Sequence, residues 1–508
     1  MGSSGQGVRV VEPLLIAKAS AEDIVLLPGM SNRHGIVCGA TGTGKTVTIQ
    51  AMCERFSEIG TPVFVADVKG DLAGLSQPGG GNEKVDQRLA EMAIPDYTPR
   101  GYPVVFWDIY GVQGHQVRTT VSEMGPVLLA RLMQLNDTQS GVLQIVFAWA
   151  DAQNYPLIDF KDLRALLGEV ADKRKEILRD YGTVSPQSIG AIQRAVLTME
   201  LQGVDKFFGE PRLNLNDFLK TDTNGMGQVN VLSASTLYQS PIAYSTFLLW
   251  LLSELFETMP EVGDPEKPNL VFFFDEAHLL FEDTPKPLRD KIVQVVRLIR
   301  SKGIGIFFIT QMPIDIPEVV LGQLGNRVEH ALRAYTPRDQ KAIRAVAETF
   351  RTNPDLDVET AVTELQVGEA LLSFLDEKGA PRVVQRALIV PPRSRVGAIT
   401  DSERAAVTQA STYGLKYAAA IDSLSAFEMI GARSQQEQAD AELAEKQAEI
   451  DNLEAKRQAD MDKATKPSSS RRKEPKSPFD DVITSATNQV GREIGRQIVR
   501  GLLGSLKR

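Results

Sequence analysis

Short apolar runs alternate with helical stretches along much of the chain, and glycine or proline marks many of the boundaries between them. The runs lie at residues 34–39, 61–68, 102–111, 227–235, 269–280, 303–311, 326–335, 369–375 and 382–390. Runs of this length are typical of the buried strands of a parallel sheet that helices cover on both faces. The pattern therefore predicts an α/β fold with a parallel-rich sheet.

A long helical region interrupts the series of predicted strands. Residues 120–226 contain several amphipathic or apolar helical stretches and no comparable strand pattern. We interpret them as a helical insert in a core formed by residues 31–119 and 227–400, with residues 1–30 as a short lead-in.

Beyond residue 400 the composition changes. Residues 401–465 predict a charged, alanine-rich helical extension, and the near-heptad spacing of its leucine and isoleucine positions leaves a short coiled coil and a solvated helix both open. Residues 466–478 form a basic, low-complexity linker. Residues 479–508 predict an amphipathic helix. The apolar positions in these two helical segments are Leu443, Ile450, Leu453, Val490, Ile494, Ile498 and Leu502.

Charge and composition narrow the classes of protein. The 508 residues carry a net charge of −9, which excludes a uniformly basic nucleic-acid-binding surface but leaves a local basic pore open. Two cysteines and four histidines provide neither a disulfide framework nor a zinc cluster, so we expect a reducing, cytoplasmic location. We expect no secretory signal and no membrane span, because no basic, then apolar start and no run of about 18 apolar residues occurs.

The strongest motif is GATGTGKT at residues 39–46, which matches the phosphate-binding pattern G-x-x-x-x-G-K-[ST]. It lies between the apolar run 34–39 and a predicted helix over 45–60, whose N-terminus would face the phosphates. Lys45 is expected to reach the β- and γ-phosphates of ATP, and the Thr46 hydroxyl to ligate Mg²⁺. The predicted nucleotide-binding residues are Gly39, Ala40, Thr41, Gly42, Thr43, Gly44, Lys45, Thr46 and Val47.

Two adjacent acids follow the most apolar run. A strand that ends in Asp275 and Glu276 would deliver both carboxylates to the carboxyl edge of the sheet, where open α/β sheets bind ligands. Asp275 is expected to hold magnesium, usually through water, and Glu276 to polarise the attacking water.

Other polar residues are candidates for the same edge. Gln311 follows the run 303–311 and would sense the γ-phosphate, orient water or cap the strand end. Residues 67–71 (DVKGD) would contact the metal site or a neighbouring subunit, or form a salt-bridged turn. A phosphoryl-transfer site also needs an arginine, and sequence does not show which one acts within a subunit and which across a boundary. The arginine candidates are Arg297, Arg300, Arg327 and Arg333, of which Arg327 and Arg333 lie in or beside the run 326–335.

These motifs together resemble the bacterial HerA-like helicase/ATPase proteins, in particular a YjgR-like subgroup long known as a domain of unknown function. The resemblance rests on LPGMSNRHGIVCGATGTGKTVTIQ, VADVKGDL, FFFDEAHLLF, LIRSKGIGIFFITQMPIDIPEVVLGQLGNRVEHALRAYTPRDQKA and the closing GREIGRQIVRGLLG. It implies a RecA-like motor of the HerA–FtsK group that uses ATP and Mg²⁺ and assembles as a ring, often a hexamer. HerA proteins carry an N-terminal β-barrel that helps to assemble the ring, and residues 1–30 are too few for one. We therefore expect the core, the insert or the C-terminal helix to form the ring.

Three functions remain open at this stage. The first is a DNA translocase or helicase-like motor, whose basic residues near 173–175 and 286–291 would line a pore or belong to a solvated helix face. The second is an ATPase that acts on a protein partner or on a membrane-associated assembly through the C-terminal helix. The third is a slow, nucleotide-gated scaffold. Residues 466–508 carry ten basic and four acidic residues, so contact with the oligomer, with anionic lipid or with nucleic acid is open for that segment.

Overall fold

A computed structural model describes residues 11–20, 22–94, 97–282 and 286–464 of the chain. Residues up to Arg433 form one compact unit, and the chain from Ser434 onward forms a second. The predicted basic linker 466–478 and the amphipathic helix 479–508 lie outside the described residues. No helix among the described residues is long and apolar enough to cross a membrane.

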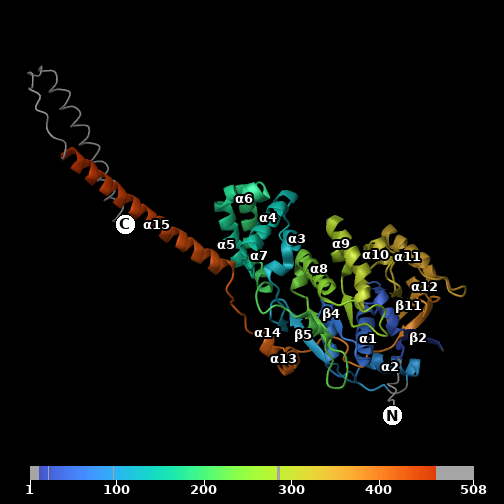
Figure 1. The fold of residues 1–508 in the computed structure, drawn as a ribbon. Coiled ribbons are helices and arrows are strands. Elements are labelled where there is room, and N and C mark those ends of the chain that lie inside the picture. Colours follow the sequence, from blue (N-terminus) through green and yellow to red (C-terminus); the bar gives the residue numbers. More distant parts are fainter. Residues whose placement is uncertain (1–10, 21, 95–96, 283–285, 465–508) are drawn as a thin grey trace, which may run out of the picture. The chain divides into compact units, whose positions relative to one another are not determined.

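A 12-stranded sheet forms the centre of the first unit (Figure 1). Its strands are β1 (Leu14–Ala19), β2 (Glu22–Leu26), β3 (Gly35–Cys38), β4 (Val63–Asp67), β5 (Val104–Asp108), β6 (His115–Gln116), β7 (Val229–Ser233), β8 (Leu270–Phe274), β9 (Ile304–Thr310), β10 (Asn326–Glu329), β11 (Glu369–Ser373) and β12 (Gln385–Ile389). Their order is β2-β1-β12-β11-β10-β3-β9-β8-β4-β7-β5-β6. The strands from β10 to β6 are parallel, and β11, β12, β1 and β2 add an antiparallel edge. The predicted α/β fold with a parallel-rich sheet is thus confirmed.

The strand order places the motif-bearing strands together. The strand between β3 and β8 in space is β9, whereas β4, which separates them in sequence, lies on the far side of β8. Residues 14–19 and 22–26 of the expected lead-in form β1 and β2: β1 pairs with β12, β2 pairs with β1, and Leu14, Ile16 and Leu26 are buried.

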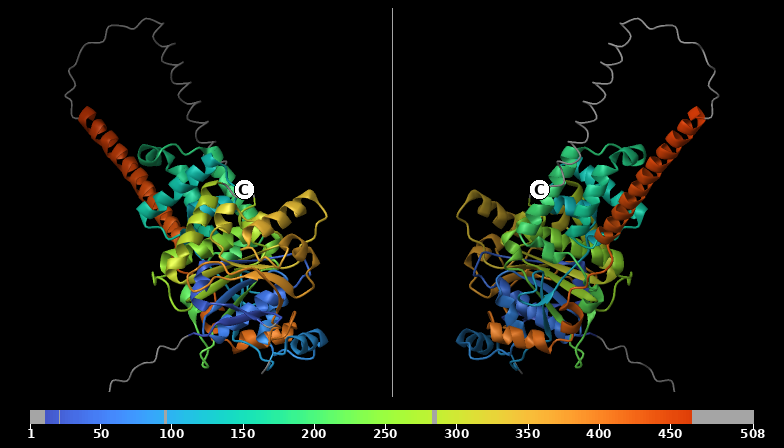
Figure 2. Two further views of the ribbon diagram at one scale, coloured as in Figure 1. Left: turned by 90° about the vertical axis from the view of Figure 1, so that its right-hand side faces the viewer. Right: turned by 90° about the vertical axis from the view of Figure 1, so that its left-hand side faces the viewer.

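Helices cover both faces of the sheet. They are α1 (Lys45–Glu58), α2 (Glu83–Met92), α3 (Val121–Leu132), α4 (Asp137–Gln153), α5 (Phe160–Asp172), α6 (Arg174–Tyr181), α7 (Pro186–Leu201), α8 (Pro241–Thr258), α9 (Lys286–Leu298), α10 (Glu318–Leu321), α11 (Pro337–Thr349), α12 (Val358–Glu364), α13 (Asp401–Ala410), α14 (Gly414–Tyr417) and α15 (Ala426–Ala464). Figures 1 and 2 show α1, α2 and α13 on one side of the sheet and α3, α8 and α9 on the other.

Side chains that alternate between the two faces of the strands form two hydrophobic cores, one on each side of the sheet. On the α1 side, the ring of Phe56 lies 6.3 Å from that of Phe273 and 6.2 Å from that of Phe307. On the other side, the rings of Phe64 and Phe272 lie 5.0 Å apart. Because successive side chains of a strand point to opposite faces, strands that are apolar throughout can pack against helices on both sides.

The helices α3 to α7 occupy much of the segment 120–226. Capping boxes start two of them: the side chain of Asn136 accepts from the Gln139 main chain before α4, and that of Asp159 accepts from the Asp162 main chain before α5. α3 packs against α8, so these helices share a core with the sheet.

Residues after the sheet run back across the first unit. The buried Glu54 carboxylate of α1 accepts hydrogen bonds from the Arg393 and Ser394 main-chain N–H groups, at 2.8 and 2.9 Å. Farther on, the rings of Tyr413 and Tyr417 lie 5.3 and 5.5 Å from the ring of Trp107. We call residues 391–417 the strap. Its contacts show that the first part of the predicted extension 401–465 packs on the core.

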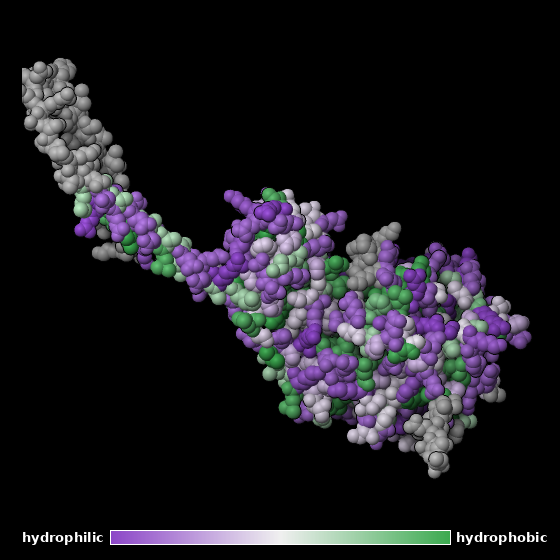
Figure 3. Space-filling model, in the orientation of Figure 1, coloured by the Kyte–Doolittle hydropathy of each residue, from purple (hydrophilic) through white to green (hydrophobic). Residues whose placement is uncertain are grey.

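The helix α15 continues beyond Arg433 with exposed side chains. Leu443, Ile450 and Leu453 are 64%, 49% and 68% exposed, and Figure 3 shows mostly hydrophilic residues along this segment. The choice between a coiled coil and a solvated helix stays open, since one chain shows no partner helix for these positions among its described residues.

The strap predicts a stability difference between two neighbouring positions. Tyr417 is fully buried, and its hydroxyl donates to Asp217 Oδ2 at 2.5 Å, whereas Leu415 is fully exposed. Tyr417→Ala should cost about 3–5 kcal/mol and lower the melting temperature clearly, because it opens a cavity and leaves a buried carboxylate short of a donor. The control Leu415→Ala should change stability by less than about 0.5 kcal/mol. Equal melting temperatures for the two variants would contradict a packed strap.

Candidate nucleotide-binding site

The carboxyl ends of β3, β9 and β8 meet at one edge of the sheet. The phosphate-loop sequence follows β3, Gln311 follows β9, and Asp275 and Glu276 follow β8. Because these three strands are parallel neighbours, the structure brings the motif residues together. Ligands of open α/β sheets bind at this edge.

Glycines allow the loop to approach other parts of the chain closely. Gly44 precedes the first residue of α1 and has a φ of 118°, in a region that disfavours residues with a side chain. A Cβ at Gly44 would lie 3.1 Å from the Gly368 nitrogen, and a Cβ at Gly39 would lie 2.5 Å from the Cβ of His330. The loop is therefore pressed against β10 and the turn before β11.

Hydrogen bonds fasten the loop to the same two segments. The Ala40 N–H donates to the Ala331 carbonyl at 2.9 Å, and the Gly368 N–H donates to the Thr43 carbonyl at 3.1 Å. These contacts hold the loop main chain in place from behind, so that its other side is free to face phosphates.

His330 completes this support, and the sequence analysis did not identify it. Its Nδ1 lies 2.8 Å from the Glu369 carbonyl oxygen, and its Nε2 lies 2.8 Å from the Thr48 hydroxyl. Since a carbonyl can only accept, Nδ1 carries the proton and Nε2 accepts from Thr48. Complete burial lowers the pKa of His330 to about 4, so the ring is neutral near pH 7. The signal in the sequence was a single polar histidine inside the predicted strand run 326–335.

Lys45 lies over the loop that precedes it. Its ammonium donates to the Gly39 carbonyl and, at 3.0 Å, to the Ala40 carbonyl. Burial lowers the pKa of Lys45, and the carboxylates of Asp275 and Glu276 partly oppose that shift. The lysine therefore belongs electrostatically to the same cluster as the two acids. The hydroxyl of Thr46 has no hydrogen-bond partner among the described residues.

The two acids have different environments. The pKa of Asp275 is raised to about 6, because burial and the charge of Glu276 raise it by more than the hydrogen bond from the Glu276 N–H and the charges of Lys69 and Lys45 lower it. Tyr244 fixes the Asp275 main chain, because its hydroxyl donates to the Asp275 carbonyl at 2.8 Å. Glu276 is 7% exposed and has a left-handed backbone with a φ of 51°, which is unusual for a residue with a side chain. Its carboxylate oxygen Oε2 lies 3.5 Å from Nδ1 of His278, a second residue that sequence reasoning missed.

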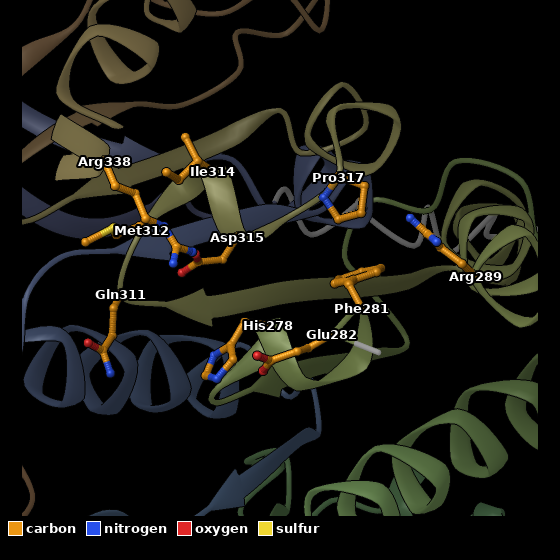
Figure 4. A pocket seen from close by; sticks show the side chains of 10 residues that line it. All are labelled: His278, Phe281, Glu282, Arg289, Gln311, Met312, Ile314, Asp315, Pro317 and Arg338. Carbon is orange, nitrogen blue, oxygen red and sulfur yellow. The ribbon is translucent and has the colours of Figure 1, made fainter. Parts of the chain in front are cut away.

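A pocket of about 640 Å³ opens beside these acids (Figure 4). Its lining residues come from the segments after β8 and β9 and from α9 and α11: His278, Phe281, Glu282, Arg289, Gln311, Met312, Ile314, Asp315, Pro317 and Arg338. Gln311 is exposed and lines the pocket. In Figure 4 Arg338 and Asp315 point toward one another, and Asp315 accepts from Arg338 at 2.7 Å and from the Thr310 hydroxyl at 3.2 Å. These bonds link the end of β9 to α11.

The structure separates the candidate arginines. Arg327 lies in the first half of β10 and donates to the carbonyls of Leu321 and Leu324, each at 3.2 Å, and burial lowers its pKa. Arg300 pairs with Asp264 at 2.9 Å. Arg297 is exposed on α9. Arg333 is exposed and contacts no acid or carbonyl among the described residues.

The segment 67–71 forms a tight turn without a salt bridge to Asp67. The Asp67 carboxylate accepts from the main-chain N–H groups of Gly70 at 2.8 Å and Leu72 at 3.1 Å. Burial raises the pKa of Asp67 to about 6, and these two hydrogen bonds oppose the shift. Lys69 is exposed, and its charge acts on Asp275.

Comparison with known proteins places this arrangement in a family. The family model for the helicase HerA-like C-terminal region matches residues 12–508. The chain belongs to this HerA-like family. Its relatives include the DNA double-strand break repair helicase HerA of Saccharolobus solfataricus, at 22% identity over 67% of this chain and 61% of that protein. The same-named protein of Sulfurisphaera tokodaii is 21% identical over 67% of this chain and 62% of its own length. The HerA-like chain thus spans about three fifths of these relatives.

Solved structures with a similar arrangement are more distant. The plasmid coupling protein TrwB in complex with a non-hydrolysable ATP analogue has a TM-score of 0.48 and 14% identity, over 77% of the HerA-like chain and 97% of TrwB. VirB4 of Thermoanaerobacter pseudethanolicus has a TM-score of 0.45 and 14% identity, over 74% and 96% of the two chains.

The buried histidine behind the loop predicts a pH dependence of stability. The pKa of His330 in the folded protein lies below its ordinary value of 6.5. The stability that its neutral imidazole contributes is therefore fully present above pH 6.5 and is lost as the pH falls toward 4. His330→Gln should lower stability at pH 7.5 by about 1–3 kcal/mol, since it disturbs buried hydrogen bonds, but should reduce the further loss between pH 6.5 and 4.5. Melting temperatures across this range test both effects.

Thr48→Val is the matched control for this prediction. It removes the same Thr48–His330 hydrogen bond but leaves the imidazole in place. Its melting temperature should fall at pH 7.5 and should keep the wild-type loss toward pH 4.5. If the two variants have the same pH profile, His330 does not titrate as proposed.

Proposed function

We propose that this HerA-like chain is an ATP-hydrolysing motor that assembles as a closed ring, with six subunits as the expected number, and that it moves along DNA. The observation that carries this proposal is the convergence of the phosphate loop, Asp275, Glu276 and Gln311 at the ends of three adjacent parallel strands. A phosphate-binding loop next to paired acids suits hydrolysis of a nucleoside triphosphate.

The residues at this edge fit ATP together with magnesium. The main chain of residues 39–47 would bind the phosphates, and the Thr46 hydroxyl and the Asp275 carboxylate would hold Mg²⁺. Both groups offer oxygen ligands, which Mg²⁺ prefers. Among the described residues, neither group is hydrogen-bonded to a basic side chain. Bound Mg²⁺ would neutralise charge on the β- and γ-phosphate oxygens.

Each protein group then has a separate task. The Glu276 carboxylate would accept a proton from the attacking water, and the neighbouring His278, 3.5 Å away, would orient it. Lys45 would leave the carbonyls of Gly39 and Ala40 and bind the β- and γ-phosphates. Gln311 would hold the water or contact the γ-phosphate from the adjacent strand.

The exposed Arg333 supports a site that is completed across a subunit boundary. It follows β10 and has no internal partner among the described residues, so it is free to reach a phosphate of a neighbouring subunit. Arg327 is committed to two carbonyls of its own chain and is the weaker candidate.

DNA is the proposed substrate because curated relatives are named DNA double-strand break repair helicases. Arg289 lines the pocket beside the acids and offers a positive group near the predicted pore segment. We place the protein in the cytoplasm, where a reducing environment suits its two buried, free cysteines.

DNA-stimulated hydrolysis is the decisive test of this function. DNA should raise the ATPase rate of the wild-type protein, and the stimulation should fall steeply between about 50 and 200 mM salt because phosphate contacts release counterions. Glu276→Gln should still bind ATP, but its turnover should fall by about 10²-fold or more, whereas Lys45→Ala should weaken binding itself. Wild-type turnover in Glu276→Gln would refute the role of the acid pair. Hydrolysis without any DNA stimulation would instead favour an ATPase that acts on a protein partner.

Mixed oligomers test the shared site. Arg333→Ala and Lys45→Ala proteins should each be inactive, and mixing them should restore part of the activity at boundaries that combine an intact loop with an intact arginine. Arg327→Ala provides the matched control, because its bonds lie within one chain and mixing should not rescue it. A fully active monomer, shown by its mass in solution, would exclude a ring.

A further inference from the structure

The order of the strands fixes the direction in which the phosphate chain of a bound nucleotide would lie along this edge of the sheet. This inference rests on the proposed function. The groups that would act on the terminal phosphate follow β8 and β9, which both lie on the same side of β3. The phosphate chain therefore points from the loop toward β9 and β8, and the nucleoside must leave on the opposite side, toward β10 and β11.

A short turn lies there and touches the phosphate loop. It comprises residues 365–368, directly before β11, and the Gly368 N–H donates to the Thr43 carbonyl at 3.1 Å. The Val367 side chain on this turn is 68% exposed. An apolar side chain that stands in solvent beside a phosphate-binding loop is suitably placed to cover one face of a base.

Arg88 of α2 reaches the same turn from another part of the chain. Its Nη2 donates to the Val367 carbonyl at 3.1 Å. A Cβ added to Gly368 would lie 3.5 Å from that nitrogen, so the guanidinium lies directly over this glycine. The φ of Gly368 is 82°, a left-handed value that favours glycine at this position.

The contacts of Arg88 leave one donor unused. Its Nε lies 3.6 Å from the Glu91 carboxylate, which is itself 61% exposed, and its Nη1 is buried without a hydrogen-bond partner among the described residues. A buried donor without an acceptor is costly, and a guanidinium that turns toward a ribose hydroxyl or a base nitrogen would gain the missing bond.

We propose that Val367 and Arg88 form the nucleoside subsite of the ATP site. The purine ring packs on the Val367 side chain and against the planar guanidinium, and the unused Arg88 donor binds the ribose or the base. A planar guanidinium stacks on aromatic rings in a way that an ammonium group does not. Arg88 thus positions the nucleoside and not the phosphates.

Binding of Mg²⁺–ADP and Mg²⁺–pyrophosphate to the full chain tests this assignment, because pyrophosphate has no nucleoside. Calorimetric titration of wild-type, Arg88→Ala, Arg88→Lys and Val367→Ser proteins gives the comparison. Both Arg88 variants should bind ADP about tenfold more weakly, and Val367→Ser a few times more weakly, with pyrophosphate binding unchanged in all three. Lys84→Ala, an exposed position on the same helix, is the control and should bind both ligands as the wild type does.

Each other outcome has a distinct meaning. Equal losses for ADP and pyrophosphate in Arg88→Ala, with full recovery in Arg88→Lys, would make Arg88 a phosphate-binding charge and overturn the subsite. Unchanged ADP binding in all variants would overturn it as well. If the wild-type protein binds neither ligand, the proposed nucleotide function fails together with the subsite. Val367→Ser changes an exposed side chain, so its result does not depend on how Arg88 substitutions affect folding.

Discussion

The close approach of the phosphate loop to β10 and the turn before β11 is the constraint on which the site depends. A Cβ at Gly39 would clash with His330, and a Cβ at Gly44, which also has a positive φ, would lie tightly against Gly368. The neutral imidazole of His330 then joins Thr48 of α1 to the start of β11. The beginning of α1, the reach of Lys45 and the direction of any bound nucleotide all follow from this packing.

The residues between His330 and Gly368, which both contact the phosphate loop, form a structural unit of their own. Residues 331–365 carry α11 and α12, whose buried side chains pack with Leu371 of β11 in a small third core. Asp315 joins α11 to the end of β9 through Arg338 and Thr310. The helix α11 therefore contacts both the segment that supports the phosphate loop and the end of β9, which Gln311 follows. A displacement of α11 would move both of these parts of the site.

Local motifs could be predicted from the sequence, and contacts between distant residues could not. The phosphate loop, the Asp275–Glu276 pair and the strand before Gln311 were visible because each is a pattern of adjacent residues. The bond between Thr48 and His330 joins residues 282 positions apart, and no spacing rule encodes it. Hydropathy likewise cannot show that Arg327 turns back to its own chain.

Composition misled in two places for physical reasons. Residues 401–417 of the strap lie within a region predicted to be a charged, alanine-rich extension, but Tyr413 and Tyr417 pack against the Trp107 ring and are buried. β1 and β2 were not expected because an edge hairpin needs only a few apolar side chains once β12 is present to pair with it.

The Glu54 carboxylate has a consequence for the order in which the protein can form. Its hydrogen-bond donors at Ser394 lie 340 residues farther along the chain, and β3 likewise waits for β9 and β10 to become an interior strand. A ribosome that adds about 5–20 residues per second needs tens of seconds to deliver them. During that interval the Glu54 carboxylate depends on water for its hydrogen bonds, and the helix face that carries it cannot yet be buried without cost. The nucleotide site is therefore among the first parts of the chain to be synthesised and among the last to be completed.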